Sequence, residues 1–168
     1  MSTNLFYTLE DSPIGQLLLL GDGRALHGLY MQDAPRPKAI APGWELASTS
    51  FADVRAQLRE YFAGERSAFD LELVMDGSPF EGRVWGALRD IPYGATRTYA
   101  DLARKVGGSP RSVGQANATN PIPIIIPCHR VLATNGIGGY SGGEGLPTKR
   151  ALLALEARAT PLFTSAAA

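Results

Sequence analysis

The first part of the chain contains short apolar runs separated by turn residues. Residues 5–8, 16–20 and 25–31 have the length and composition of β-strands, and prolines or glycines stand between them. Strands this close together along the chain pair most simply with their neighbours. The pattern therefore predicts a small antiparallel meander.

The next apolar positions follow a different period. Residues 33–47 are rich in proline and show little periodicity, which predicts a surface loop. Apolar residues then recur at helical spacing over 51–62, before Gly64, and residues 69–74 alternate as in one more strand. The first half is thus expected to be small and α/β.

The pattern of apolar residues changes after residue 76. Ser78 and Pro79 form a typical helix start, and an apolar stripe from Phe80 to Leu88 follows at helical spacing. We therefore predict two domains, an α/β domain over residues 1–76 and a mainly α-helical domain over residues 77–168.

Two short helices are expected in the middle of the second domain. Thr98 and Asp101 resemble a capping box, glycines at 107–108 end the first helix, and Ser109 with Pro110 opens a second one that Pro121 stops. This is a helix-turn-helix pattern. Helical hairpins are also abundant in proteins that never touch DNA, so the pattern alone leaves both interpretations open.

The second of these helices has an unusually small surface. Its residues include Ser112, Gly114, Ala116 and Ala118, and the longer polar side chains are Gln115 and Asn117. Such a face can lie close against a narrow DNA groove and bind with little sequence preference. Tight packing on a neighbouring helix is the alternative.

Composition narrows the classes of function. Apolar residues make up 45% of the 168 residues, and sixteen basic residues balance sixteen acidic ones, so any contact with nucleic acid must be local. A local basic stretch does exist, with Arg97, Arg104, Lys105 and Arg111 opposed by Asp101.

Without a signal peptide or a long apolar segment, the chain is expected to be soluble and cytoplasmic.

The candidate chemistry lies at residues 121–130. The apolar, proline-studded run 121–127 is predicted to be extended and buried, and it leads directly to Cys128 and His129. Cys128 is the only cysteine, so an intramolecular disulfide is impossible and a structural metal site is not expected. A lone cysteine is often an inert core residue, and neighbouring side chains of an extended segment point apart. These residues alone favour a catalytic and a structural role about equally.

The segment Ile-Pro-Cys-His-Arg-Val at 126–131 resembles the active-site signature of the O6-alkylguanine-DNA alkyltransferases. The similarity covers residues 78–158 strongly and the first half more loosely, through residues 12–17 and 58–64, and the order of the motifs matches that family. The matching segments are Phe80–Trp85, Ile91-Pro-Tyr-Gly94, Asn120-Pro121, Asn135-Gly136, Gly139–Gly143 and Lys149–Glu156. The resemblance is to the stand-alone bacterial type, with a ribonuclease H-like first domain.

This resemblance implies that Cys128 accepts an alkyl group from O6-alkylguanine in duplex DNA, once and irreversibly. A neutral thiol is a weak nucleophile, so the family removes its proton. The resemblance assigns that role to His129, acting through a bridging water and held by Glu156, while Asn120 ties together the turn around the cysteine.

The remaining roles concern DNA, because a stacked base cannot reach the cysteine and must be rotated out of the duplex. Arg111 is implied to fill the vacated place, and Tyr99 to assist rotation and later donate a proton to the guanine. The wall of the base pocket matches Pro123, Val131, Tyr140 and Ser141. Further DNA contacts are predicted at Ser112, Gly114, Gln115, Asn117 and Ala118.

Two departures from the family pattern are visible. The segment Glu144–Thr148 is longer than in many relatives, and the zinc-binding cysteines of some members are absent, so neither a metal nor another cofactor is expected. We expect a monomer whose partner is double-stranded DNA containing O6-alkylguanine.

Three other functions compete with this one. A non-enzymatic alkylated-DNA lesion-binding protein would carry another residue in place of Cys128, and a transcriptional regulator fused to an alkyltransferase would need a further domain. A cysteine hydrolase using Cys128, His129 and Glu156 would have no need of the helix-turn-helix or of Arg111.

Overall fold

The apolar runs of the first half form a sheet in the computed structural model, which describes residues 2–166. Strands β1 (Phe6–Glu10), β2 (Leu17–Gly21) and β3 (Leu26–Met31) pair antiparallel in chain order, which confirms the predicted meander. Both faces of the inner strand β2 are covered, so its leucines are all buried.

Two details of this sheet differ from the prediction. A two-residue strand, β4 (Glu45–Leu46), lies inside the predicted loop and pairs parallel with β1, which makes the sheet mixed. The strand predicted at residues 69–74 is wrong, because only Leu73 bridges to β3, at Leu26. Further along β3, the amide of Leu29 donates instead to the carbonyl of Pro121, 3.0 Å away in the second half.

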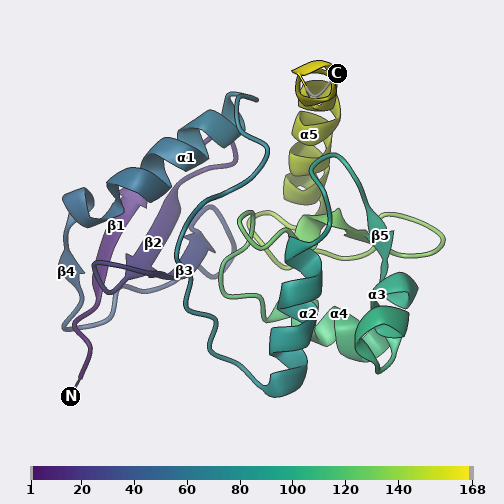
Figure 1. Cartoon of the computed structure of the whole chain (residues 1–168). Coiled ribbons are helices and arrows are strands. Elements are labelled where there is room, and N and C mark those ends of the chain that lie inside the picture. Colours follow the sequence, from purple (N-terminus) through teal and green to yellow (C-terminus); the bar gives the residue numbers. More distant parts are fainter. Residues whose placement is uncertain (1, 167–168) are drawn as a thin grey trace.

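One helix covers the sheet. A short 3-10 turn, η1 (Ser48–Phe51), leads into α1 (Ala52–Phe62), which lies over the sheet (Figure 1). The buried residues of α1 are Val54, Leu58 and Tyr61. The buried carboxylate of Glu10 on β1 accepts hydrogen bonds from two arginines of α1, which fixes the helix over the sheet. The first half therefore has the α/β structure that its sequence pattern predicted.

The second half is built mainly of helices. Helices α2 (Pro79–Arg89), α3 (Tyr99–Val106) and α4 (Pro110–Ala118) pack on one another, and each begins with a capping box that gives hydrogen-bond partners to two backbone amides at its start. The indole nitrogen of Trp85 on α2 donates to the carbonyl of Ala116 on α4, at 2.8 Å. The predicted helix-turn-helix falls on α3 and α4, joined by Gly107, Gly108 and Ser109.

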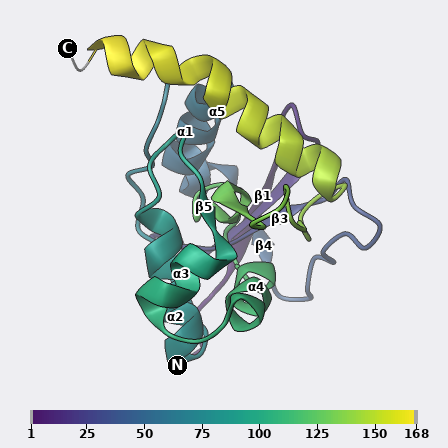
Figure 2. The same ribbon diagram turned by 90° about the vertical axis from the view of Figure 1, so that its right-hand side faces the viewer.

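A long final helix, α5 (Leu146–Ala166), crosses one end of the molecule (Figure 2). Between α4 and α5 lie a 3-10 turn, η2 (Cys128–Arg130), and strand β6 (Val131–Leu132), which pairs parallel with β5 (Arg97–Thr98). Within residues 2–166, none of the helices combines the length and apolar character that a membrane crossing requires. The fold class predicted from the sequence is confirmed.

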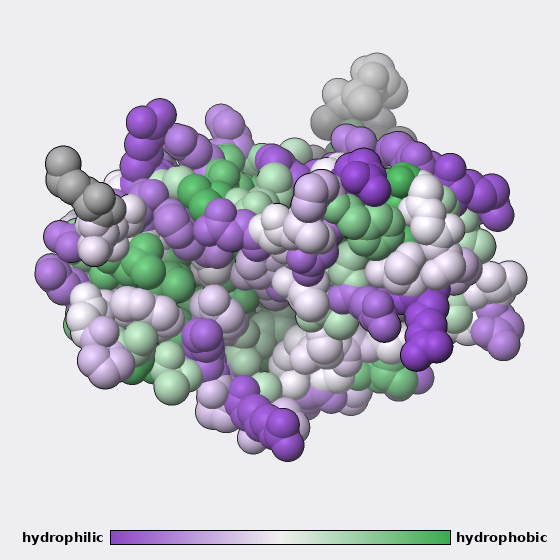
Figure 3. All heavy atoms as spheres, turned by 90° about the horizontal axis from the view of Figure 1, so that it is seen from below, coloured by the Kyte–Doolittle hydropathy of each residue, from purple (hydrophilic) through white to green (hydrophobic). Residues whose placement is uncertain are grey.

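The two halves meet along a hollowed face. Seen from below, hydrophilic and hydrophobic residues are interspersed over this face, with a hollow near its centre (Figure 3). No broad apolar patch is visible on the atoms drawn there, as expected for a polar, accessible surface.

Candidate active site

The turn that carries Cys128 is compact. Residues 121–127 are not extended as predicted: Ile124 has a positive φ of 76°, and the amide of Ile126 donates to the carbonyl of Ile122 at 2.8 Å. Cys128 then starts the 3-10 turn η2, so it and His129 are not on opposite faces of a strand. The strand geometry that was expected to point their side chains apart is therefore absent here.

Two asparagines of the α4 region hold this turn. The side-chain oxygen of Asn120 accepts from the amide of Ile122 at 3.0 Å, and its nitrogen donates to the carbonyl of Ile126 at 2.7 Å. Asn117, predicted as a DNA contact, is buried, and its side-chain nitrogen donates to the carbonyl of Cys128 at 3.2 Å. Helix α4 and the cysteine turn are thus tied together.

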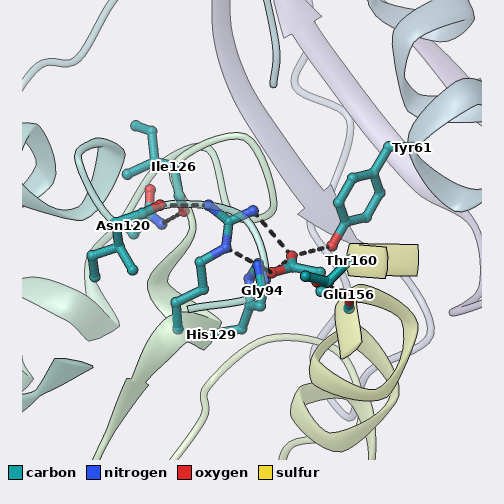
Figure 4. Close-up of polar contacts among 9 residues, drawn as sticks. Tyr61, Gly94, Asn120, Ile126, His129, Glu156 and Thr160 are labelled. Carbon is teal, nitrogen blue, oxygen red and sulfur yellow. Dashed lines mark hydrogen bonds and ion pairs between the residues drawn. The ribbon is translucent and has the colours of Figure 1, made fainter. Parts of the chain in front are cut away.

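A single buried carboxylate organises the polar centre behind the cysteine. Oε2 of Glu156 accepts hydrogen bonds from His129 Nε2 at 2.5 Å, from the Tyr61 hydroxyl at 2.7 Å and from Arg130 Nη2 at 3.1 Å. Oε1 accepts from Arg130 Nε at 2.7 Å and from the amide of Gly94 at 3.3 Å (Figure 4). Glu156 therefore has five donors, from three separate segments of the chain.

These donors set the charge of the pair. Burial pushes the pKa of Glu156 upward, but the hydrogen bonds and charges of His129 and Arg130 outweigh it and lower the pKa to about 2. Burial lowers the pKa of His129, although Glu156 opposes that shift. A neutral imidazole that donates from Nε2 carries its lone pair on Nδ1, which is buried without a hydrogen-bond partner among the described residues. His129 can accept a proton there.

The thiol itself is shielded from water. Cys128 is 5% exposed, and burial raises the pKa of its thiol, while the side chains of Asn120 and Tyr140 and the charge of Lys149 act in the opposite direction. Burial, together with the nearby Cys128, raises the pKa of Tyr140 well above its ordinary value. The resting cysteine is therefore a neutral thiol that needs a base before it can act as a nucleophile.

Lys149 is a buried residue that holds the backbone near the site, and no such role was predicted for it from the sequence. Its ammonium group donates to the carbonyls of Val131 and Ile137, each at 2.6 Å, and of Gly139 at 3.0 Å. It also lies 6.0 Å from the centre of the Tyr99 ring. These contacts fix the segment that leads from the cysteine turn to Tyr140.

A pocket of about 430 Å³ opens beside Cys128, a volume suited to a small ligand. Of the four residues predicted for the base pocket, Pro123, Tyr140 and Ser141 lie in its wall, whereas Val131 is fully buried on β6 and is not part of it. Further lining comes from the first half and had not been anticipated. Those residues are Leu29, Tyr30, Met31, Ala34, Arg36 and Lys38.

The exposed face of helix α4 carries few long side chains. Arg111, Gln115 and Ala118 are exposed at positions that share one side of the helix, whereas the hydroxyl of Ser112 is occupied by hydrogen bonds to the backbone of Ser109. The half-buried Tyr99 ring lies beside Gly114, where a Cβ atom would be 4.0 Å from it. Arg111, Tyr99 and the pocket mouth thus belong to the same part of the molecule.

Comparison with known proteins gave consistent matches. Residues 79–158 match the family described as 6-O-methylguanine DNA methyltransferase, DNA binding domain, and residues 5–75 match the ribonuclease-like domain of the same enzymes. The chain is 47% identical to a methylated-DNA–protein-cysteine methyltransferase of Mycolicibacterium paratuberculosis, over 92% of this chain and 94% of that protein. It is 41% identical to one from Methanosarcina acetivorans, over 90% of this chain and 98% of that protein.

A solved structure shows the same architecture. The crystal structure of Mycobacterium tuberculosis OGT in complex with DNA superposes with a TM-score of 0.84 at 44% identity, covering 92% of this chain and 94% of that one. The match extends over both halves described above.

Proposed function

The chain belongs to the 6-O-methylguanine DNA methyltransferase family, and from this premise we propose that it repairs O6-alkylguanine in DNA by alkyl transfer to Cys128. The observation that carries the proposal is the position of Cys128 in a pocket wall, directly before the buried His129 that is paired with Glu156. In the reaction the bond between O6 and the alkyl carbon breaks, a thioether forms at the sulfur, and guanine takes up a proton.

The nucleophile is generated by His129. The thiol is neutral at rest, and a neutral His129 whose Nε2 is held by Glu156 offers Nδ1 as the acceptor of the thiol proton, through the bridging water that the family resemblance implies. The ionised Glu156 stabilises the imidazolium that results. Asn120 keeps the cysteine turn in shape, and Asn117 is reassigned from DNA contact to the same positioning work.

The burial of Cys128 requires base flipping. At 5% exposure the sulfur cannot be reached by a base inside a stacked duplex, so the alkylated nucleotide must enter the pocket. The wall residues Pro123, Tyr140 and Ser141 would contact the base there. The hydroxyl of Tyr99 is protonated at neutral pH, since burial raises its pKa further above an ordinary value of about 10, so it carries a proton for the departing guanine.

Helices α3 and α4 form the DNA-binding element of this proposal. The exposed, small-faced side of α4 approaches the duplex groove through Gln115, Ala118 and Gly114, and Arg111 occupies the space that the flipped base leaves. Binding by shape and backbone contact suits a protein that must find lesions in any sequence. We also propose that the chain divides into two domains between residues 76 and 77. It is proposed to act as a monomer.

Intact mass spectrometry tests the reaction. Incubation with duplex DNA containing O6-methylguanine should add one methyl group per chain, on the peptide that holds Cys128, and excess lesion should not raise that number. Water cannot displace the thiol from a thioether, so each molecule acts once. Sustained turnover would contradict this mechanism and favour the hydrolase alternative.

The matched variant is Cys128→Ser. Serine is close in size but far harder to ionise, so transfer should be abolished while binding to the lesion duplex persists. Transfer that continued in this variant would show that another residue is the acceptor. Binding without transfer by the wild-type chain would indicate a lesion-binding protein instead.

A further inference from the structure

Tyr61 connects the first half of the molecule to the polar centre of the second. It lies on α1 and is fully buried, and its hydroxyl donates to Oε2 of Glu156 at 2.7 Å (Figure 4). The two residues are 95 positions apart in the sequence. Tyr61 lies in the segment 58–64, through which the first half loosely resembles the family, but no role was assigned to it there, and the chemistry proposed so far does not use it.

We propose that Tyr61 is a positioning residue for alkyl transfer, holding the Glu156 carboxylate in the orientation that His129 requires. The proposal rests on the function proposed above. It assigns to the first half a direct part in preparing the cysteine, through one hydroxyl group on α1.

The ring of Tyr61 is held independently of its hydroxyl. Its centre lies 5.2 Å from Phe62, 5.5 Å from Phe69 and 6.1 Å from Tyr93, with edge-on or tilted geometry. A phenylalanine would keep these contacts and the shape of the core. Replacing Tyr61 by Phe therefore removes the hydrogen bond and little else.

The hydrogen bond matters because Tyr61 and His129 share one oxygen of Glu156. Arg130 Nη2, 3.1 Å from that oxygen, completes its set of donors. Without the Tyr61 hydroxyl, Oε2 keeps two donors, and the carboxylate is held less firmly in the plane that His129 needs. A hydrogen bond to a charged, buried group is among the stronger polar contacts in a protein, so this loss is not trivial.

The same loss changes proton affinity in a defined direction. The charged and titratable groups that interact with Glu156 or His129 are Tyr61 from α1, Tyr93 after α2, Arg130 from η2 and Lys149 from α5. Removing one donor leaves more negative charge on Oε2 for the imidazolium to interact with. His129 then binds its proton more tightly and is blocked as a base at a higher pH.

The experiment compares Tyr61→Phe with Tyr93→Phe. Tyr93 is the matched control, because its hydroxyl has no hydrogen-bond partner among the described residues, although its ring packs against the same cluster. Single-turnover rates are measured against pH with free O6-benzylguanine, which needs no base flipping, and with duplex O6-methylguanine. Thermal unfolding and the titrated fraction of reactive protein are recorded for each variant.

We expect Tyr61→Phe to lower the plateau rate about threefold to tenfold on both substrates and to move the acidic limb of the profile to higher pH. Tyr93→Phe should match the wild type. A Tyr61→Phe profile with the wild-type plateau and limb would overturn the proposal. So would a loss that disappears once rates are corrected for the reactive fraction.

A double-mutant cycle asks whether Tyr61 acts through Glu156. If it does, Tyr61→Phe should slow the Glu156→Gln variant by less than twofold, because the carboxylate it orients is already gone. Full additivity would refute a role exerted through Glu156. Failure of the wild type to transfer any alkyl group would instead overturn the proposed function, so the two failures are distinguishable.

Discussion

Arg111→Ala should separate base flipping from chemistry. Arg111 is exposed in the first turn of α4, directly after Pro110, and its side chain makes no hydrogen bond or ion pair with the described residues. Truncating that side chain therefore breaks no polar contact within this part of the chain. A positive charge at a helix N-terminus opposes the helix dipole by about 0.3–1 kcal/mol, so the variant should be slightly more stable. For a protein of this size that corresponds to a melting temperature about 1–3 °C higher.

The expected effect on repair has the opposite sign. Unstacking and unpairing a base costs a few kcal/mol, and a side chain that fills the gap offsets part of that cost. Losing about 1.4 kcal/mol of this help slows the reaction about tenfold. Single-turnover transfer from duplex O6-methylguanine should fall by about that factor or more, while the rate with free O6-benzylguanine should stay close to wild type.

Arg104→Ala is the charge-matched control. Arg104 lies on the neighbouring helix α3 and pairs with Asp101 at the surface. Its loss should weaken duplex binding in a salt-dependent manner without slowing transfer at saturating duplex. Equal losses on both substrates for Arg111→Ala, or a lower melting temperature, would show that Arg111 supports the pocket or the fold.

Three further predictions concern backbone, pH and charge. Gly94→Ala should destabilise the chain by about 2 kcal/mol or more in urea unfolding, because φ is +78° and a Cβ would lie 2.1 Å from Thr160 Oγ1. Gly82→Ala, in open space on α2, should stabilise it, and equal effects would contradict the argument. The pKa of Glu156, about 2 when folded, lies below its unfolded value of about 4.3, so its stabilisation is present above pH ~4.5 and is lost toward pH 2. Glu156→Gln should lack that loss of about 1.4 kcal/mol per pH unit, and parallel curves would refute the assignment. Arg36→Ala, at the pocket mouth, should weaken duplex binding and reduce the salt slope by about 0.9, whereas an unchanged slope would place Arg36 away from phosphate.

Local signals explain what the sequence predicted well. The starts of α2, α3 and α4 depend on side chains within four residues of one another, and Ser78, Thr98 and Ser109 all form the capping boxes that such spacing favours. The meander depends on alternating apolar runs with turns between them. Cys128 was identified by a contiguous motif, and the surrounding family motifs gave it a role.

Features that depend on distant contacts could not be predicted. One local feature was also missed: the apolar, proline-rich segment before Cys128 was predicted to be extended, yet Asn120, to which the family resemblance gave the role of tying this turn together, folds it back through two hydrogen bonds. Asn117 was indistinguishable from a groove-facing residue until its burial was known. Tyr61 had the spacing of an ordinary core residue of α1, and nothing local indicated a partner 95 residues away. A buried hydroxyl needs a partner, but the sequence alone does not say which.

The donors of Glu156 also bear on how the chain reaches its active form. They come from positions 26 to 95 residues away, so none of them is supplied by α5 itself. A carboxylate buried before those segments arrive would be an uncompensated charge, which disfavours partly assembled intermediates and makes folding more cooperative. A protein that reacts once per molecule has a repair capacity equal to the number of chains that finish folding. Because Glu156 disfavours partly assembled chains, the number of chains able to repair DNA depends on how many fold completely.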